Sequence, residues 1–194
     1  DSTLNRSNYH LFSEATPMDK LFWGRAEIKT TYTHLIFDKN KGSQSILFNL
    51  KYKNNPELGV YFGARMGRDM KQMPSFENVD ALIPVPLHYK KAFIRGYNQS
   101  EVLAKGISET LSVPIDTQSI IRNRHTETQT KKSRFQRWDN VDSVFEIKSK
   151  LNKYKHVVLV DDVITTGSTM EALIQSIKKQ YPMLEISVVT LAIA

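Results

Sequence analysis

Three mainly apolar runs mark stretches of this 194-residue chain as strands. Residues 79–85 and 157–160 show no polar alternation, which is typical of parallel strands covered by helices on both faces. Residues 185–193 form a third β-rich run at the end of the chain. Apolar positions spaced by three and four predict amphipathic helices before and between these strands, over residues 43–51, from Pro56 onward and over 99–111. We therefore expect an α/β fold in which a parallel sheet is flanked by helices.

The chain before the first long helix has a different pattern. Residues 1–20 are polar without a sustained period, so we expect an arm or linker there and a folded domain over residues 21–194. Two β-rich runs, 26–30 and 32–38, lie close together in the sequence. They predict an antiparallel β-hairpin near the N-terminus.

The strand at residues 157–160 is followed at once by Asp161 and Asp162 and then by a hydroxyl-rich loop. Ligands of open parallel sheets bind at the carboxyl ends of strands, where these acids are expected to stand. A helix expected to start near Thr169 would favour an anion at its N-terminus. The loop before it contains Thr165, Thr166, Gly167, Ser168 and Thr169. Carboxylates suit ribose hydroxyls and the loop suits a phosphate, so one sugar phosphate would span both.

An ordinary strand-to-helix turn with carboxylates is the alternative reading of these residues. The spacing of the glycine and the hydroxyls is more restrictive than an acidic pair alone, and it favours the phosphate site.

Positive charge is concentrated in two segments of a chain whose net charge is +7. Residues 122–137 carry six Lys or Arg, and residues 88–95 carry three. Such fields attract diphosphate groups or nucleic acid, and charge alone does not decide between them. Gly96 can adopt a positive φ and fold the backbone around an anion. An ordinary loop with a helix cap at Asn98 is equally consistent with the sequence.

Residues 157–172, VVLVDDVITTGSTMEA, resemble the phosphoribosyl diphosphate (PRPP) binding motif of type I phosphoribosyltransferases. The resemblance implies that Asp161 and Asp162 hold the ribose hydroxyls and act in catalysis, and that residues 165–169 hold the 5′-phosphate. It also implies a type I phosphoribosyltransferase-like fold with Mg²⁺ as cofactor, held with PRPP mostly by substrate oxygens and water.

Further motifs extend the resemblance to the competence protein F (ComF) family over about residues 21–194. They occur in the family's order as IPVPLH, RGYNQ, Thr128-Gln129, Arg137 with Asn140, and Phe145. The resemblance places a pyrophosphate loop after the first parallel strand, at Leu87, His88, Tyr89, Lys90, Lys91, Arg95 and Gly96. It also implies a flexible hood over PRPP, with Arg122, Arg124, Thr128, Gln129, Lys131, Lys132, Arg134 and Arg137.

One feature of the ComF family is missing from this sequence. ComF proteins commonly begin with a four-cysteine zinc ribbon, and this sequence contains no Cys. We therefore expect the ribbon to precede Asp1 in the complete protein. Zinc cannot be predicted for the residues in this sequence, and we assign no metal-ligating side chain, since the five His also lack metal-ligand spacing.

Two functions follow from the resemblance. The first is an enzyme that displaces pyrophosphate from C1 of PRPP with a nitrogen nucleophile, where carboxylates and cations stabilise the developing charges. The sequence identifies no general base, and the acceptor stays open. The second is a non-enzymatic module that senses PRPP or binds single-stranded DNA, because ComF relatives are implicated in natural transformation and the DNA-uptake machinery.

Aromatic residues bear on the second function. They lie among the cations, where rings can stack on bases, at Tyr89, Phe93, Tyr97, Phe135 and Trp138. Core or loop anchoring is the more ordinary role for most of them.

The sequence has no uncharged apolar run of the roughly 20 residues that cross a bilayer, and no signal-peptide pattern opens it. We expect a cytoplasmic protein without membrane contact.

Overall fold

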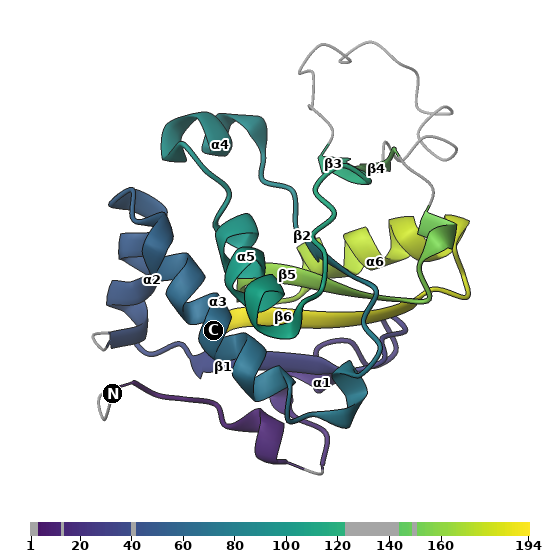
Figure 1. Cartoon of the computed structure of the whole chain (residues 1–194), viewed down its shortest axis with the longest axis horizontal. Helices are drawn as coiled ribbons and strands as arrows, with labels where there is room; N and C mark the ends of the chain where they lie inside the picture. Colours follow the sequence, from purple (N-terminus) through teal and green to yellow (C-terminus); the bar gives the residue numbers. More distant parts are fainter. Residues whose placement is uncertain (1–3, 13, 40–41, 123–143, 149–150) are drawn as a thin grey trace, which may run out of the picture.

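The computed structural model describes residues 4–12, 14–39, 42–122, 144–148 and 151–194. At its centre is a four-stranded, wholly parallel sheet in the order β1-β6-β5-β2 (Figure 1). Its strands are β1 (Thr31–Ile36), β2 (Ala81–Pro84), β5 (His156–Ile164) and β6 (Glu185–Ile193). The pairing of β2 with β5 confirms that the first two predicted strands share one sheet.

Helices cover both faces of the sheet, as the apolar spacing predicted. On one face lie α2 (Gly42–Tyr52), α3 (Pro56–Met70) and α5 (Gln99–Leu111). On the other face lie α6 (Ser168–Gln180) and the short α1 (Pro17–Lys20). Packing of their apolar stripes on the sheet supplies most of the stability of such helices. In the described part of the chain, each helix is too short or too polar to cross a bilayer.

Two glycines allow α3 and α5 to cross in close contact. A Cβ on Gly63 would lie 2.1 Å from the Leu103 carbonyl oxygen, and one on Gly106 would lie 2.1 Å from the Val60 carbonyl oxygen. Any side chain at these positions would push the helices apart. The close crossing positions α5, whose N-terminus reaches β5 through Ser100.

Smaller elements surround this framework. Strands β3 (Ile120–Arg122) and β4 (Phe145–Ile147) form an antiparallel pair on either side of residues 123–143, which lie outside the described residues. Helix α4 (Tyr89–Arg95) projects from the body of the domain (Figure 1). Three short 3₁₀ helices complete the described elements, η1 (Tyr9–Leu11), η2 (Pro74–Phe76) and η4 (Leu151–Lys153).

The predicted antiparallel hairpin is wrong. Residues 26–30 form no strand, and Thr31–Ile36 pairs in parallel with β6. Only Thr31 separates the two runs that the pattern marked, which is too short for the two or more loop residues of a hairpin. The first run instead leads the chain to the edge of the sheet, where the Lys29 N–H donates to the Ile186 carbonyl at 2.7 Å.

The described part of residues 1–20 lies against the domain. Tyr9 and Met18 are buried in the core. Thr16 and Asp19 form a capping box at the start of α1. The division of the chain at residue 20 stays a prediction, but this arm is anchored by packing and by hydrogen bonds.

Candidate functional site

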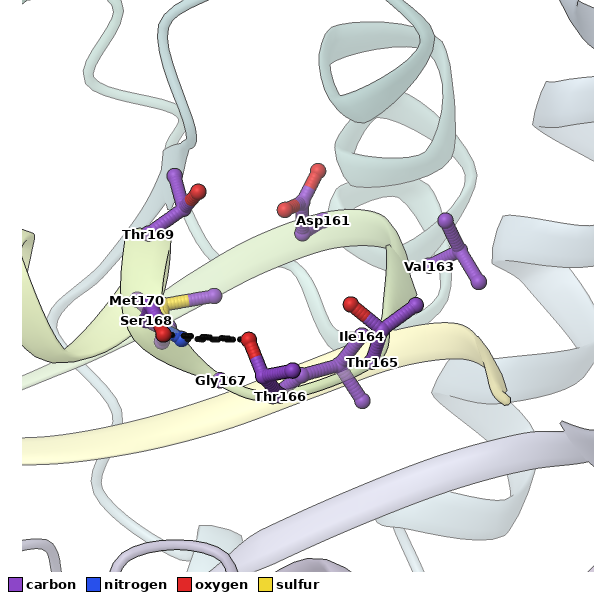
Figure 2. A pocket seen from close by; sticks show the side chains of 9 residues that line it. All are labelled: Asp161, Val163, Ile164, Thr165, Thr166, Gly167, Ser168, Thr169 and Met170. Carbon is purple, nitrogen blue, oxygen red and sulfur yellow. Dashed lines mark hydrogen bonds between the residues drawn. The ribbon is translucent and has the colours of Figure 1, made fainter.

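A small hollow opens at the carboxyl end of β5, where the chain passes into α6 (Figure 2). Strand β2 ends at Pro84, which pairs with Val160, so within the described structure the rest of β5 pairs only with β6. The hollow is lined by Asp161, Val163, Ile164, Thr165, Thr166, Gly167, Ser168, Thr169 and Met170. The structure therefore brings one predicted acid together with the whole predicted phosphate loop.

The loop after β5 turns sharply into α6. Gly167 is the N-cap residue and has a φ of 76°, which strains residues that carry a Cβ. The Thr166 and Ser168 hydroxyl oxygens lie 3.0 Å apart, and the four hydroxyl side chains of the loop are exposed. The first N–H groups of a helix lack intrahelical partners, so this turn offers several donors to one anion. Helix α6 begins at Ser168, one residue before the predicted start.

Asp161 is the acid that lines the hollow. Its Oδ1 accepts hydrogen bonds from the Ser100 hydroxyl at 3.0 Å and from the Asp162 N–H at 2.8 Å. Burial, followed by the charge of the neighbouring Asp162 carboxylate, raises the pKa of Asp161 to about 7. A carboxyl group that titrates near neutrality inside a cleft is typical of a functional site.

Asp162 is held on the other side of the strand, because neighbouring residues of a strand point to opposite faces. It is 8% exposed and does not line the hollow. The Lys51 ammonium of α2 lies 3.1 Å from its Oδ2 and forms an ion pair with it. Both acids were expected just beyond the strand, but β5 continues to Ile164, and its pleat separates the two carboxylates.

The segment RGYNQ forms the entry to α5. Asn98 is the N-cap residue, with its Oδ1 accepting from the Ser100 N–H at 3.0 Å and its Nδ2 donating to the Val85 carbonyl at 3.1 Å. Gly96 has a φ of 76°, as predicted. The helix-cap reading is therefore correct. The cap also presents Ser100 to Asp161, which links this segment to the hollow.

The segment predicted as a pyrophosphate loop is largely helical, which corrects the expectation of a loop from Leu87 to Gly96. Helix α4 forms there because neither Gly nor Pro interrupts residues 87–95, and the N–H of Lys91 donates to the His88 carbonyl at 2.8 Å. The described side chains of α4 do not line the hollow. Arg95 instead donates to Gln99 Oε1 at 2.6 Å. A role of this segment in binding pyrophosphate stays a prediction.

Of the predicted hood residues, only Arg122 is described. It ends β3, and its guanidinium lies 5.6 Å from the centre of the Phe145 ring on β4. The other predicted hood residues lie outside the described residues: Arg124, Thr128, Gln129, Lys131, Lys132, Arg134 and Arg137.

Three side chains at the site were missed by sequence reasoning. Ser100 bonds Asp161, Lys51 pairs with Asp162, and Arg25 donates to the Thr166 carbonyl at 2.8 Å. Ser100 directly follows the RGYNQ motif, so the sequence near it could have indicated its role. The sequence near Lys51 and Arg25 gives no such indication, because each of these residues contacts a partner far away in the chain. Among the described residues, no three His, Asp or Glu side chains converge as metal ligands.

Comparison with known proteins identifies the family of the chain. A family model described as "Phosphoribosyl transferase domain" matches residues 97–193, which include both acids, the loop and α6. The chain belongs to the phosphoribosyltransferase family. Its curated relatives place it with the ComF proteins, as the sequence motifs indicated.

Three relatives illustrate the extent of the similarity. Competence protein F of Haemophilus influenzae is 37% identical over 114 residues, 58% of this chain and 50% of that protein. The DNA utilization protein YhgH of Escherichia coli K12 is 25% identical over 183 residues, 84% of this chain and 80% of that protein. Competence protein ComFC of Bacillus subtilis is 27% identical over 135 residues, 70% of this chain and 53% of that protein. The match thus spans about half the length of competence protein F.

A solved structure shows a weaker likeness. The purine phosphoribosyltransferase from Pyrococcus horikoshii OT3 is 19% identical with a TM-score of 0.37, over 74% of this chain and 76% of that chain. This score is too low to bear on the fold, which is defined here by the order and direction of the strands.

Proposed function

We propose that this protein binds PRPP with Mg²⁺ in the hollow lined by Asp161 and residues 163–170 and transfers the phosphoribosyl group to a nitrogen acceptor in the cytoplasm. One observation carries the proposal: a carboxylate and a hydroxyl-rich helix N-terminus line the same hollow. The loop from Thr165 to Thr169 suits the dianionic 5′-phosphate, and the Asp161 carboxylate suits the ribose hydroxyls, which are donors.

In the proposed reaction, the lone pair of the acceptor nitrogen forms a bond to C1 of the ribose. The bond between C1 and the diphosphate oxygen breaks, pyrophosphate leaves with the electron pair, and the acceptor releases its proton to solvent. Positive charge develops on the ribose, where the Asp161 carboxylate stabilises it. Negative charge develops on the diphosphate, which Lys91 and the basic residues of the predicted hood are suited to neutralise.

The site is compatible with the magnesium that the family implies. Mg²⁺ is usually held by one or two carboxylates together with phosphate and water oxygens, so a full set of protein ligands is not required. The described hydrogen bonds of Asp161 both use Oδ1. Asp161 is therefore the residue suited to hold the ion, which would supply charge neutralisation at the diphosphate when bound.

Calorimetric titration with Mg²⁺-PRPP tests the proposal. Asp161→Asn should weaken binding by about 1.5–3 kcal/mol, roughly ten- to a hundredfold, because it removes charged hydrogen bonds to ribose. Asp162→Ala should act in the same direction if it shares the ribose role that the family resemblance implies. Glu185→Gln is the matched control, since this acid lies at the opposite end of the neighbouring strand. Equal affinity of Asp161→Asn and the parent would contradict the proposal.

A second candidate function is binding of single-stranded DNA, which a surface on α2 and α4 favours. Tyr52 is 62% exposed and Phe93 is 92% exposed. The Arg95 guanidinium lies 5.7 Å from the Tyr52 ring centre. Exposed rings beside cations suit stacking of bases and pairing of phosphates. Tyr97, by contrast, is anchored, with its hydroxyl donating to the Leu50 carbonyl.

Fluorescence anisotropy with a labelled oligothymidine tests this second candidate. Affinity should fall log-linearly with salt, with a slope of about 0.7 for each neutralised phosphate. Phe93→Ser and Lys131→Glu/Lys132→Glu should both weaken binding. Unchanged affinity in these variants at low salt would show that the surplus charge does not serve nucleic acid.

A further inference from the structure

The phosphate loop has a supporting wall that comes from the N-terminal segment, outside the region matched by the family model. A Cβ on Gly167 would lie 3.8 Å from Leu21 Cβ and from Phe22 Cε1, and 3.9 Å from Arg25 Nη1. Phe22 is buried at 1% exposure, so this wall is part of the core. The segment after α1 therefore packs directly behind the turn at Gly167.

Arg25 holds the backbone of this loop in one orientation. Its Nη1 donates to the Leu21 carbonyl at 3.0 Å and to the Thr166 carbonyl at 2.8 Å. In a planar trans peptide, the carbonyl and the next N–H point in opposite directions. Because the Thr166 carbonyl faces Arg25, the Gly167 N–H points away from Arg25. Arg25 does not line the hollow, so it acts from behind the loop.

Arg25 also neutralises an acid just beyond the loop, Glu171. Its Nε donates to Glu171 Oε2 at 3.0 Å, and Glu171 lies in the first turn of α6. A carboxylate there suits the helix dipole but repels an anion at the same helix end. The pair is partly exposed, with side chains 36% and 23% accessible. The ion pair therefore changes the charge at the loop more than it changes the stability of the fold.

We propose that Arg25 is a positioning residue for the phosphate loop: it orients the peptide between Thr166 and Gly167 and cancels the charge of Glu171, so that the loop accepts the phosphate group of a sugar phosphate. The proposal deepens the proposed function and depends on it. It makes the segment from Pro17 to Arg25 part of the ligand site, although no side chain of that segment lines the hollow.

Calorimetry with ribose 5-phosphate and with Mg²⁺-pyrophosphate tests the inference. Arg25→Met should weaken ribose 5-phosphate binding by about tenfold, because loop orientation and charge are both lost. Pyrophosphate binding should change by less than about twofold, which corresponds to a few tenths of a kcal/mol in binding free energy. Lys29→Met is the matched control, because Lys29 also forms a partly exposed ion pair, with Glu185, but at the other end of the sheet.

A rescue experiment separates positioning from a general loss of structure. The double variant Arg25→Met/Glu171→Gln removes the uncompensated carboxylate and should recover a measurable part of the lost ribose 5-phosphate affinity. Melting temperatures show whether both variants fold, and Arg25→Lys keeps the charge should Arg25→Met fail to fold. Parent-like affinity in Arg25→Met, equal losses for both ligands, or absence of rescue would overturn the positioning role. If the parent protein binds neither ribose 5-phosphate nor PRPP, the proposed function fails and this inference fails with it.

Discussion

Two acidic residues of this domain, Asp69 and Asp161, have surroundings that shift their pKa values in opposite directions. Asp69 Oδ2 accepts from Arg6 Nη2 at 2.6 Å and from the Tyr32 hydroxyl at 2.6 Å, and it lies 3.1 Å from His34 Nδ1. Burial alone would raise the pKa of Asp69, but the hydrogen bonds from His34, Tyr32 and Arg6 outweigh it and hold the pKa well below its usual range.

Asp161 receives far less support. One hydroxyl and one amide meet its Oδ1, and burial with the Asp162 charge raises its pKa to about 7. The Asp69 carboxylate is thus stabilised by donors from three parts of the chain. The Asp161 carboxylate has fewer donors, so its negative charge is unfavourable in the folded state. A ligand that brings its own hydrogen-bond donors or a cation would stabilise the Asp161 charge. This is the difference expected between an acid that stabilises the fold and an acid that binds a ligand.

The largest expected effect is at Asp69. Asp69→Asn should destabilise the fold by about 3 kcal/mol, because it breaks a buried charged network and replaces the carboxylate that three groups share with a neutral amide. Since the folded pKa of Asp69 lies below the unfolded value, its contribution is present above about pH 4 and is lost as pH falls further. The free energies of unfolding of the parent and the variant, measured with urea, should therefore become equal at acidic pH. Glu109→Gln, an exposed acid on α5, should change little. A parent-like Asp69→Asn would remove the contrast between the two acids.

An intermediate effect is expected at Lys51. Lys51→Met should cost roughly 2 kcal/mol, because the buried Asp162 carboxylate loses its ion-pair partner. Lys51→Met/Asp162→Asn should regain part of that loss. Lys53→Met is the control, because Lys53 is exposed on the surface two residues further on. Equal unfolding free energies for the parent and Lys51→Met would show that this pair does not hold Asp162 in place.

The smallest expected effect has the opposite sign. Asp161→Asn should stabilise the fold by roughly 1 kcal/mol above pH 7, because it removes a buried charge and keeps an oxygen for Ser100. The folded pKa of Asp161 is raised to about 7, so the folded state binds more protons than the unfolded state between about pH 4 and 7. The advantage of the variant should therefore grow as pH rises through that window and then level off. Thermal unfolding across pH measures this, and a lower melting temperature for Asp161→Asn at pH 8 would contradict it.

Local sequence patterns predicted the elements that depend on near neighbours in the chain. The bounds of α5 and β6 agree with the apolar pattern, and the positive φ at Gly96 and the cap at Asn98 follow from residue chemistry. The predictions of a loop at α4 and of a hairpin were wrong. At α4, the family resemblance implied a loop, but the local residues form a helix. For the hairpin, a distant strand supplied a better partner than the adjacent run.

By itself, the sequence determined the strand, the acids, the hydroxyl-rich loop and the start of α6, because a single stretch of residues 157–172 contains them all. Only the tertiary structure decided how the two acids differ. The pleat of β5 turns Asp161 toward the hollow and Asp162 toward Lys51, and the folded chain brings Ser100 and Arg25 to the site from other elements. The physical reason is range: backbone conformation responds to adjacent residues, whereas charge pairing and side-chain hydrogen bonds depend on which distant segments the packed sheet and helices bring within about 3 Å of one another.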